Sequence, residues 1–317
     1  MRYRPLGQSG LLVSVVGLGC NNFGGRLDAD RTRSVVDAAI DVGITLFDTS
    51  DTYGGGGGSE RALGEILGSR RDQVVLATKF GGRGVDMGYG PAAGAKGGRA
   101  YIRRAVAGSL RRLRTDYIDL YQLHVPDLAT PVEETLAALS ELVTEGKVRY
   151  IGHSNFSGWQ LADAAHLATI GGHTPFISAQ NHWSLLERAA EAEVVPAARH
   201  FGVGVLPYFP LANGLLTGKV RRGQQVPAGS RLASRAGYVT EKKLTKVEAL
   251  IAWAQDHGAT VLEVAIGALA AQPGCSSVIA GAMTPEQLKA NATASEWIPS
   301  AAELAEIDQI VPPPPAR

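Results

Sequence analysis

The feature that most constrains the fold is a regular alternation of short apolar runs with longer segments of helical periodicity. The apolar runs lie at 13–19, 42–47, 74–77, 117–123, 148–152, 176–179, 203–206 and 277–280. The helical segments lie at 30–42, 59–69, 100–114, 131–145, 157–169, 189–201, 241–257 and 260–271. Short apolar strands separated by helices are typical of a parallel sheet that helices cover.

Eight such strands in 317 residues are most simply accommodated in one α/β domain, residues 1–317, folded as a (β/α)8 TIM barrel. An open, doubly wound sheet is the alternative. The segment 2–12 contains Gly7-Gln8-Ser9-Gly10 and predicts an N-terminal β-hairpin ahead of the barrel. Two long connections, 81–99 and 209–240, predict functional loops at the C-terminal face.

Composition favours a soluble protein with a small partner. The chain is 45% hydrophobic and 19% charged with a net charge of +1, which gives no reason to expect nucleic acid or a membrane. The two cysteines form no disulfide framework, and no Cys/His cluster has the spacing of a metal site. The first residues lack the apolar core of a signal peptide, and Glu263 interrupts the longest apolar helix. We therefore expect a cytoplasmic protein; the sequence does not define its oligomeric state.

The candidate chemistry lies where apolar strands end in polar residues. Asp48 ends the second strand, Lys79 the third and His124 the fourth, and Tyr53 follows Asp48 just before the glycine run 54–58. In a barrel the site lies at the carboxyl ends of the strands, and neighbouring strands are about 4.8 Å apart. These four side chains should therefore meet within roughly 10 Å, in a cluster that suits a small carbonyl group.

Each of these residues also has a plainer interpretation. Lys79 alone fits a solvated lysine, His124 a core or rim histidine, and Asp48 the cap of a turn. Their recurrence at equivalent strand ends favours a site, in which the Lys79 ammonium beside a carboxylate stays charged and lowers the pKa of the Tyr53 phenol from about 10. A metal-dependent hydrolase is the alternative class, but the ligands are too few for a catalytic metal.

Two further segments predict a dinucleotide site. Thr284-Pro285-Glu286-Gln287 is a capped helix start whose N–H groups suit a phosphate, although a plain capped helix fits as well. The loop 210–219, with its glycines and terminal Lys219, follows the seventh strand and favours the phosphate interpretation. By contrast, 17–22 only partly matches the fingerprint GxGxxG, because Asn22 stands at its last position.

Taken together, the motifs resemble the aldo-keto reductase family, in the branch that includes potassium-channel beta subunits and bacterial reductases. The resemblance covers nearly the whole chain. It rests on D-T-S-D-T-Y-G (48–54), A-T-K-F (77–80), S-L-R-R-L (109–113) with D-Y-I-D-L (116–120), Q-L-H (122–124), G-H-S-N-F (152–156) and 210–219.

The resemblance implies a catalytic tetrad of Asp48, Tyr53, Lys79 and His124, and an NADPH cofactor. Ser154, Asn155 and Gln180 would hold the nicotinamide carboxamide, and Tyr208 would stack on its ring. The remaining implied cofactor residues are Cys20, Asn21, Phe209, Pro210, Leu211, Lys219, Arg231, Gly281, Gln287 and Asn291.

The chain departs from the family pattern near the cofactor. Phe209 stands where many members have serine, Gly281 and Gln287 stand where some have the lysine and arginine that hold the 2′-phosphate, and Ala290 replaces an acid. Arg231, twelve residues after Lys219, lies near where the channel-subunit branch places an arginine on this phosphate. We expect an NADPH-dependent reductase of aldehydes and ketones with Tyr53 as proton donor; the alternative is a cofactor-sensing subunit with little turnover.

Overall fold

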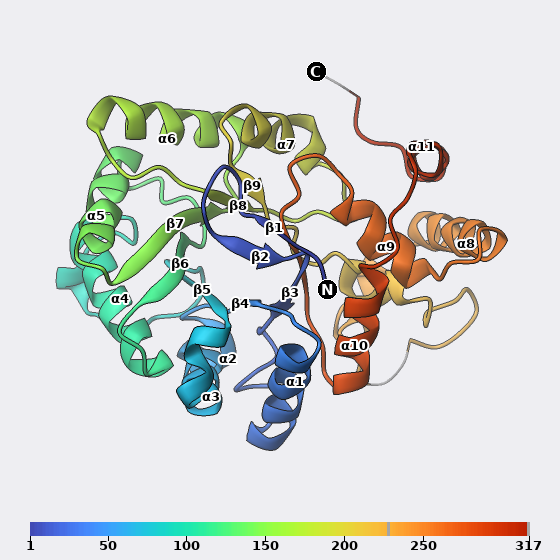
Figure 1. The fold of residues 1–317 in the computed structure, drawn as a ribbon, viewed down its shortest axis with the longest axis horizontal. Coiled ribbons are helices and arrows are strands. Elements are labelled where there is room, and N and C mark those ends of the chain that lie inside the picture. Colours follow the sequence, from blue (N-terminus) through green and yellow to red (C-terminus); the bar gives the residue numbers. More distant parts are fainter. Residues whose placement is uncertain (227–228, 316–317) are drawn as a thin grey trace.

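The computed structural model describes residues 1–226 and 229–315, and within them eight parallel strands form one sheet (Figure 1). Their order is β10-β3-β4-β5-β6-β7-β8-β9. The strands are β3 Val16–Gly19, β4 Leu46–Asp48, β5 Val75–Phe80, β6 Ile118–Leu123, β7 Val148–Ser154, β8 Ser178–Gln180, β9 Gly204–Val205 and β10 Val278–Ala280.

Hydrogen bonds between the segments that contain the two outer strands, β9 and β10, close the sheet into a barrel. Val205 N donates to Gly274 O at 2.8 Å, and Ile279 N donates to Pro207 O at 2.9 Å. The predicted (β/α)8 fold is therefore confirmed, and the carboxyl ends of all the strands meet at one face.

Helices surround the barrel (Figure 1). They are α1 Ala29–Asp41, α2 Tyr53–Gly56, α3 Gly58–Leu67, α4 Arg99–Leu113, α5 Val132–Thr144, α6 Gly158–Gly171, α7 Ala190–His200, α8 Glu241–Asp256, α9 Val261–Ala270, α10 Pro285–Ala294 and α11 Ala301–Ile310. Short 3₁₀ helices lie at η1 Gly68–Gln73, η2 Pro91–Ala93, η3 Ala212–Thr217, η4 Leu232–Ser234 and η5 Ala236–Tyr238. None of the helices in the described part of the chain is long and apolar enough to cross a membrane.

The first strands divide differently from the prediction. The apolar run 13–19 was expected to be one barrel strand, but Leu12–Ser14 (β2) pairs antiparallel with Tyr3–Pro5 (β1), and the barrel begins only at Val16. The Ser14 hydroxyl donates to Val16 O at 2.6 Å, and Ser14 N donates to Thr45 Oγ1 at 3.0 Å. These bonds mark a bend that the apolar pattern alone does not reveal.

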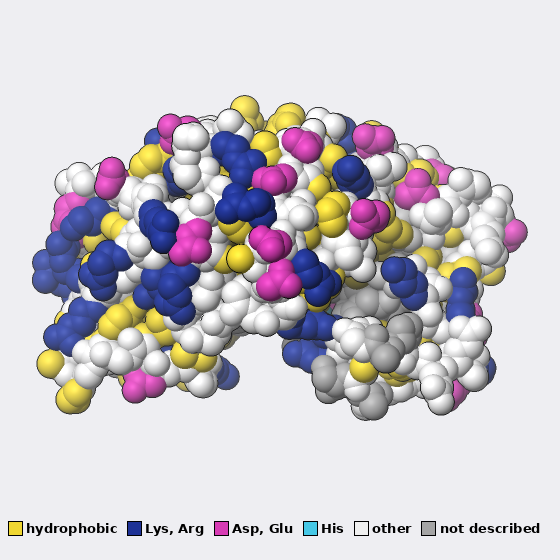
Figure 2. Space-filling view, turned by 90° about the horizontal axis from the view of Figure 1, so that it is seen from below, with side chains coloured by type: hydrophobic (Ala, Val, Ile, Leu, Met, Phe, Trp, Pro, Cys, Tyr) yellow, Lys and Arg dark blue, Asp and Glu magenta, His cyan; other side chains and the backbone are white. Residues whose placement is uncertain are grey.

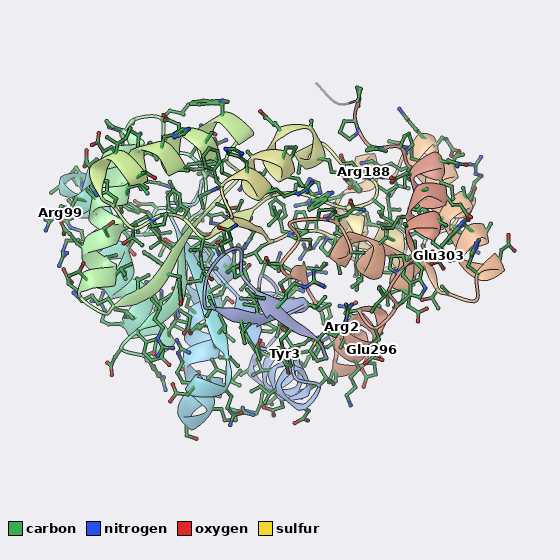
Figure 3. All side chains as sticks on the ribbon, turned by 45° about the horizontal axis from the view of Figure 1, so that its top comes forward. Arg2, Tyr3, Arg99, Arg188, Glu296 and Glu303 are labelled. Atoms are coloured by element: carbon green, nitrogen blue, oxygen red, sulfur yellow. The ribbon has the colours of Figure 1, made fainter. Side chains whose placement is uncertain are left out.

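The hairpin β1–β2 plugs the amino-terminal end of the barrel. Leu6 and Val13 are fully buried in one cluster with residues of the barrel, namely Leu46, Ala77, Leu120, Leu206 and Ile279. Arg2, labelled in Figure 3, donates to Ser295 O at 2.6 Å, and Arg4 donates to Ala270 O at 2.9 Å. With one end filled, the opposite end is left for the site.

The last helix, α11, was not predicted, although the sequence carries its start signal. Ser300 accepts from Glu303 N while Glu303 Oε2 accepts from Ser300 N at 2.6 Å, which is a capping box. Arg188 (Figure 3) holds this helix by donating to Asp308 Oδ1 and Val311 O, both at 2.6 Å.

The plug generates a stability prediction. Because Leu6 is fully buried, Leu6→Ala should lower the free energy of unfolding by about 2–5 kcal/mol through lost burial and a cavity. Leu12→Ala, in the same hairpin but 58% exposed, should change it by less than about 0.5 kcal/mol. Urea unfolding followed by circular dichroism measures both, and equal losses would show that the hairpin merely covers the barrel.

Candidate active site

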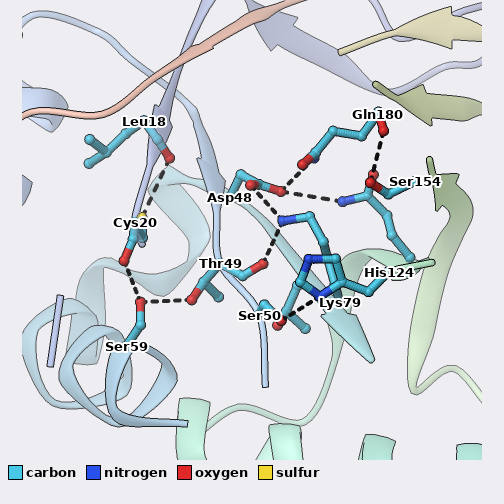
Figure 4. Close-up of polar contacts among 12 residues, drawn as sticks. Leu18, Cys20, Asp48, Thr49, Ser50, Ser59, Lys79, His124, Ser154 and Gln180 are labelled. Carbon is cyan, nitrogen blue, oxygen red and sulfur yellow. Dashed lines mark hydrogen bonds and ion pairs between the residues drawn. The ribbon is translucent and has the colours of Figure 1, made fainter. Parts of the chain in front are cut away.

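The centre of the site is a buried ion pair between neighbouring strands (Figure 4). Lys79 at the end of β5 donates from Nζ to Asp48 Oδ2 at 2.7 Å and to Thr49 O at 2.9 Å. The Lys79 side chain is fully buried and that of Asp48 is 4% exposed. The register that pairs Asp48 with Ala77 brings the two side chains together.

The second oxygen of Asp48 is held by two amides from other strands. Gln122 of β6 donates to Oδ1 at 3.3 Å, and Gln180 of β8 donates to the same atom at 2.9 Å. Burial disfavours the Lys79 ammonium, but the charge of the Asp48 carboxylate and its hydrogen bond to Nζ outweigh this effect, so the pKa of Lys79 is raised. The expectation that Lys79 keeps its charge is confirmed.

Tyr53 lies above this pair because the backbone after it takes a glycine-only path. Gly54 and Gly55 have φ of 67° and 71°, and a Cβ on Gly54 would lie 2.7 Å from Phe23 O. This irregular turn, α2, places the Tyr53 ring centroid 5.1 Å from Lys79 Nζ. The ring also meets that of His124 edge-on, with centroids 5.8 Å apart.

The predicted direction of the Tyr53 pKa is wrong. Burial of the phenol raises its pKa above 10.0, and although the ammonium of Lys79 lowers it as expected, that effect is smaller. Asp48 neutralises much of the lysine charge at short range and adds to the rise. Tyr53 is therefore protonated at neutral pH, which is the state that a proton donor needs.

His124 is neutral. Burial, together with the charges of Lys79 and Lys96, lowers its pKa to about 3. Its Nδ1 lies 3.1 Å from Ser50 Oγ, and the imidazole packs against Gly82, where a Cβ would be 3.0 Å from Nδ1. This contact turns Nδ1 toward the protein, and within the described residues Nε2 has no hydrogen-bond partner.

The residues expected at the nicotinamide form a connected network on β7, β8 and the segment after β9. Tyr208 donates from its hydroxyl to Asn155 Oδ1 at 2.8 Å, Asn155 donates to His124 O at 2.9 Å, and Ser154 Oγ donates to Gln180 O at 2.8 Å. Asn155 has a φ of 63°, a conformation that asparagine tolerates better than most residues. The structure thus joins four predicted residues to the His124 strand end.

A second group of predicted cofactor residues gathers around Arg231. Its guanidinium donates to Asn21 Oδ1 at 2.9 Å and to Asn22 Oδ1 at 3.1 Å, and it lies 5.1 Å from the Phe209 ring centroid. A Cβ on Gly281 would lie 3.8 Å from Asn21 Oδ1, so this glycine borders the same group.

The other predicted cofactor residues lie on three segments: the one after β3, the one after β9, and helix α10. Cys20 is fully buried beside Asn21, and Pro210 is buried ahead of Leu211, which precedes η3. Gln287 Oε1 accepts from Met283 N at 2.9 Å in the first turn of α10, where Thr284 is the predicted cap. Asn291 is buried in the same helix, and Lys219 is exposed beyond η3.

Several residues of the site were missed. Arg26 and Arg235 lie close enough to Arg231 that their charges, after burial, lower its pKa. Arg235 also lies 5.7 Å from the Phe209 ring centroid, and Arg26 donates to Gly229 O at 2.7 Å. The basic composition of the long loop was a signal for Arg235, but nothing local marked Arg26. Figure 2 shows the hollowed lower edge of the molecule, away from the viewer in Figure 1, with basic side chains beside the hollow.

Comparison with known proteins gives a family over nearly the whole chain. Residues 15–312 match the model of the Aldo/keto reductase family. The chain is 40% identical, over 99% of its length and 97% of the relative's, to the uncharacterized oxidoreductase YrpG of Bacillus subtilis (strain 168). It is 33% identical, over 100% of its length and 98% of the relative's, to a probable voltage-gated potassium channel subunit beta of Arabidopsis thaliana. It is 34% identical to L-glyceraldehyde 3-phosphate reductase of Escherichia coli (strain K12), with 98% and 92% covered.

The fold is a closed parallel barrel, and the family match together with the relatives named as oxidoreductases places the chain among the oxidoreductases. The chain belongs to the aldo/keto reductase family.

The ion pair generates a second prediction. Lys79→Met leaves Asp48 buried without its cation, so the free energy of unfolding near neutral pH should fall by about 3–5 kcal/mol. The double variant Asp48→Asn/Lys79→Met removes both charges and should recover a large part of that loss. Urea unfolding of the two variants decides the matter; a double variant as unstable as the single one would mean that lost packing, rather than an uncompensated charge, is responsible.

Proposed function

We propose that this protein is a cytoplasmic NADPH-dependent reductase that converts aldehydes and ketones to alcohols, with Tyr53 as the proton donor. The observation that carries the proposal is the buried Lys79–Asp48 pair beneath Tyr53, with the edge of His124 against the phenol. Family membership supports a nicotinamide cofactor and a small carbonyl substrate.

The side chains present fit such a cofactor. Asn155 and Ser154 offer an amide and a hydroxyl beside the His124 strand end, and the Tyr208 ring stands next to them. Amide and hydroxyl groups pair with a carboxamide, and an aromatic ring stacks on a planar heterocycle. The arginine group around Arg231 supplies guanidinium donors for phosphate. When bound, the cofactor supplies the hydride.

In this proposal the four central residues have different roles in the reaction. Tyr53, protonated because of its raised pKa, donates its proton to the carbonyl oxygen as negative charge develops there. The Lys79 ammonium, held by Asp48, stabilises the phenolate that remains. His124, neutral because of its lowered pKa, orients the oxygen through Nε2.

The direct test is cofactor oxidation with a reactive aldehyde such as 4-nitrobenzaldehyde, followed by absorbance. We expect brisk turnover with NADPH. Absence of turnover by a folded protein that binds NADPH would overturn the proposal in favour of the second candidate, a cofactor-sensing subunit. That candidate rests on the relatives named as potassium-channel beta subunits.

The third prediction tests the proton donor. Tyr53→Phe keeps the ring but removes the acid, so kcat should fall by a factor of about 10²–10⁴. The dissociation constant for NADPH should stay nearly unchanged, because the phenol acts in the transition state. Tyr117→Phe, which removes a surface hydroxyl bound to Asp72 at 2.6 Å, is the matched control and should leave kcat intact. Full turnover by Tyr53→Phe would rule out Tyr53 as the donor.

The fourth prediction concerns the choice of nicotinamide. The 2′-phosphate of NADPH needs charged donors, and we assign it to Arg231 with Arg26 and Arg235 nearby. Arg231→Ala should weaken NADPH binding by about 1.5–3 kcal/mol and leave NADH binding almost untouched. Lys219→Ala, proposed at the pyrophosphate that both cofactors share, should weaken both alike. Fluorescence quenching measures the affinities of wild type and of both variants for the two cofactors, and equal losses from Arg231→Ala would show that it does not read the 2′-phosphate.

A further inference from the structure

The hydroxyl of Ser50 lies between the active-site histidine and a buried carboxyl group (Figure 4 shows its contact with His124). Ser50 Oγ is 3.1 Å from His124 Nδ1 and 3.2 Å from Asp51 Oδ1. Thr52 N donates to the same oxygen at 3.3 Å, and the Thr52 hydroxyl is 3.1 Å away. Ser50 has a single proton, so it can donate to His124 or to Asp51, but not fully to both.

The carboxyl group of Asp51 forms no ion pair with the other residues that the structure describes. It is fully buried, and its Oδ2 has no hydrogen-bond partner among the residues that the structure describes. Glu60, the acid whose charge acts on Asp51, is itself bound by Arg112 at 2.6 Å and by Thr78 at 2.6 Å. A buried carboxyl group with one oxygen unpaired is costly to ionise, which favours its protonated form.

The groups that face Asp51 come from every element around it. They are Glu60 of α3, Lys96 and Tyr89 of the loop after β5, Arg112 and Tyr101 of α4, and Tyr121 of β6. Lys79 reaches Asp51 only through its backbone oxygen, which accepts from Asp51 N at 3.0 Å, and His124 is linked to it through Ser50. Burial and the charge of Glu60 raise the pKa of Asp51 to about 7, against the opposing effects of Ser50, Arg112 and Lys96. Asp51 is therefore the group of this cluster that changes charge near neutral pH.

The state of Asp51 decides which nitrogen of His124 carries the proton. When Asp51 is protonated, it does not need the Ser50 proton, so Ser50 donates to Nδ1 and the ring keeps its proton on Nε2. When Asp51 is ionised, its carboxylate takes the Ser50 proton, and Nδ1 must donate to Ser50 Oγ. The ring is neutral in both cases, so Nε2 loses its proton as Nδ1 gains one.

We infer that Ser50 and Asp51 are positioning residues that set the tautomer of His124, so that ionisation of Asp51 converts Nε2 from a donor toward the substrate oxygen into an acceptor. The inference rests on the proposed function, because only a donating Nε2 orients and polarises a carbonyl oxygen. A lone pair on Nε2 repels that oxygen instead.

The tautomer itself can be measured without substrate. In protein with ¹⁵N-labelled histidine, the His124 resonances should report the Nε2–H form at about pH 5.5 and the Nδ1–H form at about pH 9, with a midpoint near the Asp51 pKa. Wild-type protein suffices, so the result does not depend on whether a variant folds. A single tautomer across this range would overturn the inference.

The pH dependence of kcat in two variants tests the same inference through catalysis. In wild type, kcat for 4-nitrobenzaldehyde at saturating NADPH should fall by up to about tenfold for each pH unit above the Asp51 pKa. Asp51→Asn fixes a neutral side chain and should hold kcat at its low-pH plateau throughout. Ser50→Ala removes the hydroxyl that connects Asp51 to His124, so it should lower kcat at every pH and abolish this decline.

Asp127→Asn is the matched control, since Asp127 lies near Lys96 but accepts from Gly97 N and Ala129 N, and the described part of the chain shows no hydrogen bond between it and His124. Its pH profile should match that of wild type. A decline that survives in Asp51→Asn would overturn the inference while leaving the reductase function intact. A tautomer change without any turnover would support the role of Asp51 and refute the proposed function.

Discussion

The buried ion pair between Lys79 and Asp48 is the constraint on which the site depends. A buried ammonium and a buried carboxylate each lose several kcal/mol of hydration, and only close pairing with further hydrogen bonds offsets this cost. The barrel provides both, because Asp48 and Lys79 end adjacent strands and Gln122 and Gln180 reach Asp48 from two others. Four strands therefore converge on one carboxylate, and no member of the group can move alone.

The sequence predicted this convergence because it follows from parallel strands. A residue at the end of one strand lies beside the residue at the end of the next, so Asp48, Lys79 and His124 could be placed together from their positions alone. The roles of Ser154 and Gln180 came instead from the resemblance to the family. Strand positions failed to predict Arg26 and Ser50, because their places depend on how loops fold back over the barrel rather than on strand order.

Energies were harder to predict than positions. The Tyr53 pKa was expected to fall because of the Lys79 charge, but this reasoning omitted the burial of the phenol, which has the larger effect. Element boundaries failed where one apolar run served two sheets, as at Ser14, where side-chain hydrogen bonds turn the chain from the hairpin into the barrel. Both errors have one cause: a sequence pattern shows which residues are buried, but not what surrounds each of them.

Burial and one ion pair together set the protonation of the whole centre. Asp48 keeps the Lys79 ammonium charged. Burial, and after it this charge, oppose a second proton on the His124 ring, whose pKa falls to about 3. Tyr53, packed over the same ammonium, stays protonated because burial prevails. A permanent cation, a neutral base and a protonated acid thus lie in contact across the neutral range. The acid–base roles therefore follow from burial, which raises the pKa of Tyr53 and lowers that of His124, and from Asp48, which keeps the Lys79 ammonium charged.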